Sequence, residues 1–415
     1  MKSTYKYLLE LLNISIHNQD LNYNENNYTD LNLEEIYKLA KEHNILPLIY
    51  EGINNINDFD KNNELIKLWK NQAISIEINQ VQKSVEFLNV YNALVKSGIT
   101  PIVVKGITCR ELYPVPDSRP SSDEDILIKE DEFELCDKIL KSNGMRSIDN
   151  GSFKDKDVIS YFNSNSRLMI EVHKTLFNKN EEEHVNLFNE FYKNCFEEKM
   201  ELNIQGQKVY TFPHTMNLLY LITHTAKHFL HGGVGIRQIC DIVKFIEVYH
   251  KEIDWADLWS KLQAIKYDYF VFALLNIGEL YLGLCETCID YPKWYNKSTI
   301  DSSYLLEDIL DAGIFGGSTM ERKQSSLMTL SAVNNSEASN SKLSFIAALL
   351  PSASRLEGRY TYLKKMPILL PIAWGNRLAT YIKEKNNNGQ LRDSVFQSVT
   401  IGNQRIELLK KYKII

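Results

Sequence analysis

Closely spaced acidic residues mark one segment of this 415-residue chain as a candidate for metal chemistry. Asp123 and Asp125 open the run Asp-Glu-Asp-Ile-Leu-Ile128. The run is acidic at first and then apolar, and its apolar part is typical of a strand. Alternate residues of a strand project from the same face, so the two carboxylates would lie side by side. They would repel each other unless a cation lay between them, and hard oxygen ligands of this kind suit Mg²⁺ or Mn²⁺.

A third acid occurs in an apolar segment, Leu-Met-Ile-Glu171-Val-His173. An acid has no structural reason to lie in an apolar strand, and His173, two residues further on, would share the face of Glu171. Ile170 and Val172 would point the other way, into the core. A site holding two ions about 3.5–4 Å apart needs a third carboxylate, normally from a neighbouring strand. We therefore predict a catalytic metal site formed by the two aspartates and Glu171.

The elements that must position these acids form a small α/β unit. A β-branched run precedes Lys105-Gly106, and a loop containing Pro114, Pro116 and Pro120 separates it from the acidic strand. Strand–helix–strand followed by further strands is typical of a small mixed sheet. We expect strands at 100–104, 123–128, 158–162 and 167–173, with helices at 107–113 and 131–142.

The remainder of the chain has helical patterns. Residues 63–95 hold no Gly or Pro and return apolar side chains repeatedly, which predicts one long helix or two in line. Further helices are expected at 215–230, 236–249 and within 255–284. We predict an α+β fold in which a small mixed-sheet core is embedded in a mostly helical chain. The expected parts are an N-terminal helical region at 1–95, the α/β core at 96–205, a helical domain packing on the active-site cleft at 206–300, and a C-terminal helical extension at 301–415 with a Ser/Asn-rich loop near 316–342.

Four motifs occur in a characteristic order along this segment. They are Val104-Lys105-Gly106, Tyr113-Pro-Val-Pro-Asp-Ser-Arg119-Pro120, Asp123-Glu-Asp125 and Glu171-Val-His173. The order resembles the DNA polymerase beta-like nucleotidyltransferase superfamily and, within it, a group of uncharacterised bacterial nucleotidyltransferases. The similarity covers about residues 35–290 and includes His224-Thr-Ala-Lys-His228 and Gly235-Ile-Arg237-Gln-Ile-Cys-Asp241. Each motif is weak alone, but the combination is specific.

The resemblance implies a fold and an activity. An acceptor hydroxyl would attack the α-phosphate of a nucleoside triphosphate such as ATP, and pyrophosphate would leave. In a two-metal mechanism, one Mg²⁺ (or Mn²⁺) on all three acids would activate the acceptor oxygen, and a second on the aspartate pair would hold the triphosphate. The phosphates would be contacted by Lys105, Gly106, Arg119 and Ser122. The site would be lined by His173, His224, His228 and Arg237.

Other interpretations remain open at this point. The superfamily usually has Gly or Ser after its motif glycine, whereas this chain has Ile107, so a catalytically silent nucleotide-binding or regulatory protein is the alternative. His224, His228 and His231 share one helix face and, with Asp241, would suit a His-based metal phosphohydrolase. Glu171 could instead be a buried ion-pair partner. Arg237 and Asp241, four residues apart, most simply form an ion pair within one helix.

The composition excludes several classes of protein. Lys and Arg total 47 against 53 Asp and Glu, a net charge of −6 that argues against a protein whose main task is to coat nucleic acid. Six cysteines are too few for a disulfide scaffold and suit a reducing compartment. No apolar run reaches the roughly 18 residues of a membrane helix. We expect a soluble, cytoplasmic protein whose acceptor, a small molecule, protein or RNA, the sequence does not name.

Overall fold

The computed structural model describes residues 2–22, 32–57, 59–148, 153, 156–177, 185–231, 233–297, 300–312, 329, 363, 366–376 and 391–415. The chain divides into two compact units, Met1–Thr225 with Ile236–Ser303, and Ala226–Gly235 with Tyr304–Ile415. The strands of the described residues all lie in the first unit. The four-part division expected from the sequence stays a prediction, and its Ser/Asn-rich loop lies outside the described residues apart from position 329.

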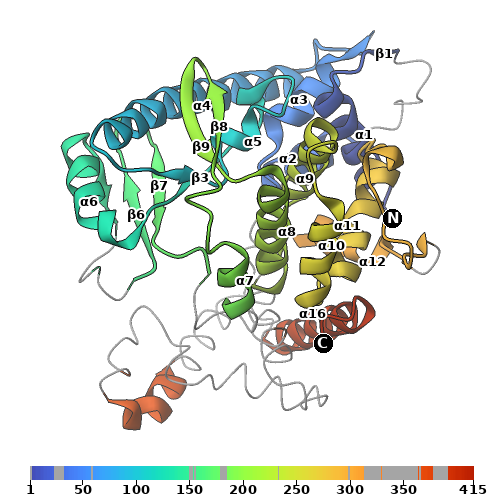
Figure 1. Ribbon diagram of the computed structural model, residues 1–415. Coiled ribbons are helices and arrows are strands. Elements are labelled where there is room, and N and C mark those ends of the chain that lie inside the picture. Colours follow the sequence, from blue (N-terminus) through green and yellow to red (C-terminus); the bar gives the residue numbers. More distant parts are fainter. Residues whose placement is uncertain are drawn as a thin grey trace. The chain divides into compact units, whose positions relative to one another are not determined.

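A seven-stranded mixed sheet forms the centre of the first unit, with the strand order β5-β6-β7-β4-β3-β9-β8 (Figure 1). β4 pairs in parallel with β7, and β3 pairs in parallel with β9, while the other neighbours are antiparallel. The strands are β3 (Ile102–Val103), β4 (Glu124–Leu127), β5 (Arg146–Ser147), β6 (Val158–Phe162), β7 (Met169–His173), β8 (Met200–Ile204) and β9 (Gln207–Thr211). The four strands expected from the sequence are confirmed as β3, β4, β6 and β7.

The β8–β9 hairpin was not expected from the sequence. It turns at Gln205 and Gly206, which both have positive φ, at 51° and 80°. Two successive residues of this conformation are the requirement of a tight hairpin turn whose twist matches the flanking strands. The strands themselves are polar and carry the sequence Met-Glu-Leu-Asn-Ile and Gln-Lys-Val-Tyr-Thr, which explains the weak signal.

The register between β4 and β7 decides where the acidic side chains meet. Asp125 lies opposite Glu171, and Leu127 lies opposite His173. Because side chains alternate along a strand, Ile126, Ile170 and Val172 face the other side of the sheet, where they belong to the hydrophobic core. The predicted separation of an acidic face from an apolar face is therefore confirmed.

Helix α4 (Glu64–Lys96) confirms the long helix predicted from residues 63–95 and runs along the sheet as one continuous element (Figure 1). It begins at Asn63, whose side chain accepts a hydrogen bond from the Leu65 N–H at 2.8 Å. Its C-terminal half packs with α6 (Phe133–Ser142) on the apolar face of the sheet. The core there includes Phe87, Tyr91 and Leu94 of α4, Cys136 and Leu140 of α6, and Ile126, Ile159, Ile170 and Val172 of the strands.

The other helices account for most of the remaining described chain. The N-terminal group contains α1 (Ser3–His17), α2 (Leu33–Glu42) and α3 (Leu46–Asn54), with a short parallel pair of β1 (Leu21–Asn22) and β2 (Ile56–Asn57). Within and after the sheet come α5 (Ile107–Arg110), α7 (Val185–Phe191), α8 (His214–His231), α9 (Ile236–Tyr249), α10 (Trp255–Ala264) and α11 (Asp268–Tyr281). The second unit contains most of α12 (Ser303–Ala312) and all of α16 (Leu391–Lys411).

These elements confirm the predicted fold class, a mixed sheet embedded in a mostly helical chain. Single 3₁₀ turns occur at η3 (Pro116–Ser118), η4 (Glu130–Glu132), η5 (Glu286–Cys288) and η9 (Pro367–Leu369). In the part of the chain that the structure describes, no helix is both long enough and apolar enough to cross a membrane.

Tyr91 joins α4 to two strands of the sheet, and its removal should weaken the first unit. Its hydroxyl donates to the Pro101 carbonyl at 3.1 Å and accepts from the Tyr210 N–H at 2.8 Å. We expect Tyr91→Phe to lower the free energy of unfolding by about 1–3 kcal/mol, because both backbone groups lose their partner. Urea denaturation followed by circular dichroism measures this. Tyr304→Phe, at a residue that is 59% exposed, is the matched control and should change stability by less than about 0.5 kcal/mol.

Candidate active site

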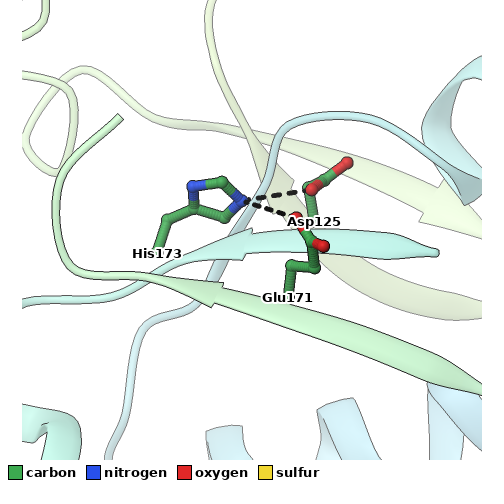
Figure 2. A group of neighbouring side chains, drawn as sticks. All are labelled: Asp125, Glu171 and His173. Atoms are coloured by element: carbon green, nitrogen blue, oxygen red, sulfur yellow. Dashed lines mark hydrogen bonds and ion pairs between the residues drawn. The ribbon is translucent and has the colours of Figure 1, made fainter. Parts of the chain in front are cut away.

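Three side chains from β4 and β7 converge at the acidic face of the sheet. Asp125, Glu171 and His173 each offer a potential ligand atom, and these atoms lie within 4.8 Å of one another. His173 Nε2 is 3.1 Å from Asp125 Oδ1 and 3.8 Å from Glu171 Oε2, as Figure 2 shows. A carboxylate can only accept a hydrogen bond, so the Nε2–H of His173 donates to Asp125. The structure thus brings three of the predicted site residues together.

Burial and nearby negative charge both raise the pKa of Glu171. Burial raises the pKa of Glu171 to about 7, and the charges of Asp125 and Asp123 act in the same direction. His173 and Lys105 oppose this increase in the Glu171 pKa. Asp123 lies one residue before β4 and outside the group of three, but its charge is close enough to act on Glu171. All three acids therefore contribute to one region of negative potential.

This donor set fits a divalent cation. Two carboxylates and one imidazole nitrogen on adjacent strands match the oxygen and nitrogen ligands that such ions take in proteins. His173 Nδ1 is buried and has no hydrogen-bond partner, so Nε2 is the nitrogen that faces the carboxylates. Among the described residues, no other group of three or more His, Cys, Asp or Glu side chains is arranged to hold an ion.

Lys105 and His224 lie beside the acidic group. Lys105 follows β3 and is nearly buried, with its Nζ 3.3 Å from His224 Nε2 on α8. The positive charge of Lys105 lowers the pKa of Glu171. Lys105 is therefore a predicted phosphate contact whose charge acts on the acidic group.

Tyr220 is a site residue that the sequence analysis missed. It lies one turn before His224 on α8, and the two rings are 5.7 Å apart between centroids. Burial raises the pKa of Tyr220 well above its ordinary value, and the charges of Asp125, Glu171 and Asp123 add to this. The available signal was the spacing of four residues between Tyr220 and His224, which puts both side chains on one face of the helix.

Gly106 has a role that differs from the predicted phosphate contact. It precedes α5 with φ +76°, and a Cβ at this position would overlap the carboxylate of Glu124. That carboxylate accepts the Ile107 N–H and a hydrogen bond from Arg110 Nη1, both at 2.7 Å. The N–H of Ile107, which opens α5, therefore already has a partner, and the phosphate contact of Gly106 stays a prediction. The Ile107 side chain is buried in the core.

Arg119 also differs from its prediction as a phosphate clamp. Its guanidinium is fully buried and pairs with both carboxylate oxygens of Asp241 on α9, at 2.9 and 2.6 Å. Tyr113 donates a third hydrogen bond to Asp241 at 2.7 Å. Burial alone would raise the pKa of Asp241, but Arg119 and Tyr113 hold it below its ordinary value.

The expected ion pair between Arg237 and Asp241 is therefore wrong. Asp241 pairs with Arg119 from the loop, and Arg237 Nη1 instead donates to the Pro120 carbonyl at 2.8 Å. A bidentate partner from another segment satisfies the buried carboxylate better than a residue one turn earlier in the same helix. Both arginines thus attach the loop at 113–121 to α9.

Helix α4 holds the same loop from another side. Gln80 Oε1 accepts the Ser121 N–H at 2.9 Å, and Lys83 Nζ donates to the Ser121 carbonyl at 3.1 Å. Ser121 Oγ in turn donates to the Asp123 carbonyl at 2.7 Å. These bonds fix the backbone immediately before the acidic strand. These roles of polar residues in the middle of a long helix were not predicted from the sequence.

Two predicted residues lie away from these contacts. Ser122 is exposed, next to Asp123. His228 follows His224 by one helical turn but belongs to the second unit, so its role at the site stays a prediction. Asp241, which the phosphohydrolase hypothesis needs as a metal ligand, is committed to Arg119 and Tyr113.

Comparison with known proteins shows the family of this chain. The model of a family described as uncharacterised nucleotidyltransferase matches residues 29–283, which is more than half of the chain. The chain belongs to this family. It also matches the crystal structure of an antigenic nucleotidyltransferase-like protein from Paracoccidioides brasiliensis, at 16% identity and a TM-score of 0.31, over 50% of this chain and 95% of that one. No curated protein matches the chain in sequence.

Neutralising Glu171 should stabilise the metal-free protein in a pH-dependent way. A carboxyl group whose pKa is raised by folding destabilises the fold above that pKa, and the penalty disappears as protons bind. In EDTA at about pH 8, Glu171→Gln should raise the free energy of unfolding by on the order of 1–3 kcal/mol. The gain should shrink as the pH falls through about 7 and be absent below the ordinary value of 4.5. Urea denaturation across this range measures it.

Glu197→Gln is the matched control, because Glu197 is an exposed acid that does not belong to the acidic group. This variant should leave stability unchanged at every pH. A Glu171→Gln gain that is the same at low and high pH would contradict the electrostatic origin of the effect.

Removing the charge of Asp241 should destabilise the protein strongly. Asp241→Asn leaves the buried guanidinium of Arg119 without a compensating charge, which typically costs about 3–5 kcal/mol. Asp257→Asn is the comparison, since Asp257 pairs with Lys261 at the surface, where such pairs contribute about 0–1 kcal/mol. Denaturant titrations of the two variants should therefore differ clearly. Equal losses would show that the Arg119–Asp241 pair does not hold the loop.

Proposed function

We propose that the protein is a metal-dependent nucleotidyltransferase that moves a nucleoside monophosphate from a nucleoside triphosphate to an acceptor hydroxyl. The acceptor oxygen forms a bond to the α-phosphorus, the bond from that phosphorus to the β-phosphate oxygen breaks, and pyrophosphate leaves. One observation carries the proposal: Asp125, Glu171 and His173 meet across the β4–β7 pair in a chain that belongs to a nucleotidyltransferase family.

The acidic residues are the proposed ligands of Mg²⁺ or Mn²⁺. Asp125 and Glu171 would hold the ion directly, and Asp123 would complete the carboxylate set of a two-metal site. A cation bound there would supply the positive charge that neutralises the triphosphate and lowers the pKa of the acceptor hydroxyl. His173 fits a positioning role, because its ring contacts Asp125 and lies 3.8 Å from Glu171.

The basic residues divide into two roles in this proposal. Lys105 is the proposed phosphate contact, because its ammonium group lies beside the carboxylates and next to His224. Arg119 and Gly106 are proposed as positioning residues, since Arg119 pairs with Asp241 and Gly106 allows the close approach of Glu124. Arg237 acts in the same way through the Pro120 carbonyl.

Substitution of the acids separates this function from the alternatives. Asp125→Asn should lower metal-dependent release of pyrophosphate on the order of a hundredfold or more, because it removes a charged ligand with little change in shape. Asp131→Asn, at an exposed acid in the 3₁₀ turn η4 that follows β4, is the matched control and should keep full activity. The measurement is nucleotide transfer with Mg²⁺ or Mn²⁺ in variants whose circular dichroism matches the parent protein.

The acceptor can be found by incubating the protein with each labelled nucleoside triphosphate and Mg²⁺ or Mn²⁺ in cell extract. Label on a molecule of the extract that is absent with Asp125→Asn would identify it. Nucleotide binding by calorimetry with no product under any nucleotide, metal or extract would instead support the catalytically silent alternative. Stoichiometric zinc or iron retained through purification and lost in His224→Ala would favour the phosphohydrolase.

A further inference from the structure

A stripe of exposed apolar side chains follows the outer side of α4. Ile74, Ile78, Val81 and Val85 are 40%, 54%, 44% and 51% exposed. The residues on an adjacent side of the helix, including Ala73, Gln80 and Ser84, are buried against the rest of the first unit. Contiguous apolar patches of this kind on soluble proteins usually mark an interaction surface.

The spacing of the stripe is that of a helix–helix seam. Successive members are separated by four, three and four residues, which is the alternation of a heptad pattern. The stripe extends roughly 16 Å along the helix at 1.5 Å per residue. The β-branched Ile78 and Val85 would occupy one heptad position and Ile74 and Val81 the other. Such side chains pack as knobs into the holes of a facing helix.

The face also lacks charge. The exposed residues of this fully described helix between positions 71 and 89 are all uncharged: Asn71, Ile74, Ser75, Ile78, Val81, Gln82, Val85 and Asn89. The charged residues within that range, Glu77, Lys83 and Glu86, are only partly exposed, and they bond Ser118, the Ser121 carbonyl and Asn163. Two such faces can therefore meet without repulsion between like charges.

We propose that α4 mediates an antiparallel homodimer through this stripe. The separations of four, three and four residues are the same from either end of the stripe. A two-fold axis between positions 79 and 80 therefore places each stripe residue of one copy opposite a stripe residue of the other. Ile78 of one copy packs against Val81 of the other, and Ile74 packs against Val85. The flanking Lys70 then lies beside Asn89 of the second copy. A parallel pair would instead place Lys67 and Lys70 beside their own copies, which like charge disfavours.

The size of the seam determines how tightly the two copies bind. One helix pair over this length buries less than the roughly 1,200–2,000 Å² of a standard stable interface. The dimer should therefore dissociate on dilution, in the micromolar range or above. This inference does not depend on the proposed function, because none of the stripe residues belongs to the acidic site.

Complementary charges test both the surface and its direction. In sedimentation equilibrium of the full chain, Ile78→Glu alone and Val81→Lys alone should each be monomeric at concentrations where the parent protein is dimeric. An equimolar mixture of the two variants should restore the dimer, because the antiparallel register places the introduced glutamate of one chain beside the introduced lysine of the other.

Leu68→Glu is the matched control. Leu68 is 47% exposed on the same helix but lies about 110° around the axis from the stripe, so this variant should dimerise like the parent. Circular dichroism of each variant should match that of the parent protein, which would show that all are folded. A parent protein that stays monomeric up to millimolar concentration, or a dimer that survives Ile78→Glu, would overturn the proposal. A mixture that stays monomeric would overturn the antiparallel register.

Discussion

The parallel pairing of β4 with β7 is the constraint on which the site depends. Its register sets Asp125 directly beside Glu171, and the strand alternation turns both away from the core. Placing two carboxylates side by side in a partly buried position is unfavourable, and the raised pKa of Glu171 records that cost. Such an arrangement is stabilised by a positive charge bound next to the two carboxylates. We propose that a divalent cation, which also binds the phosphates of the substrate, supplies this charge.

Two buried ion pairs build the frame around that point. Arg119 with Asp241 attaches the loop before β4 to α9, and Arg110 with Glu124 attaches α5 to β4 itself. Buried pairs contribute little net stability, but losing one partner is costly, so they select one conformation over others. The consecutive acids Glu124 and Asp125 point to different sides of β4. Glu124 faces α5, where Arg110 neutralises its charge, whereas Asp125 faces the site, where it can bind a cation.

The strands and helices could be predicted where a local sequence pattern determines the secondary structure. The apolar residues next to Glu171 in the sequence predicted that it lies in a strand and points away from the core. The absence of Gly and Pro from residues 63–95 predicted the long helix α4. Sequence reasoning did not find the partners that long-range packing gives to polar groups. Arg119 pairs with Asp241, and the Ile107 N–H, one residue after Gly106, donates to Glu124. Tyr220, Gln80 and Lys83 were missed because their roles depend on which segments the fold brings together.

The position of the metal tests the account most directly. Crystals grown with Mn²⁺ and measured at an energy where manganese scatters anomalously would show each bound ion as a discrete peak. We expect a peak between β4 and β7, about 2.0–2.2 Å from carboxylate oxygens of both Asp125 and Glu171. A peak bound elsewhere while this position stays empty would rule out the proposed metal site. The amine of Lys105 lying between the two carboxylates would also rule it out.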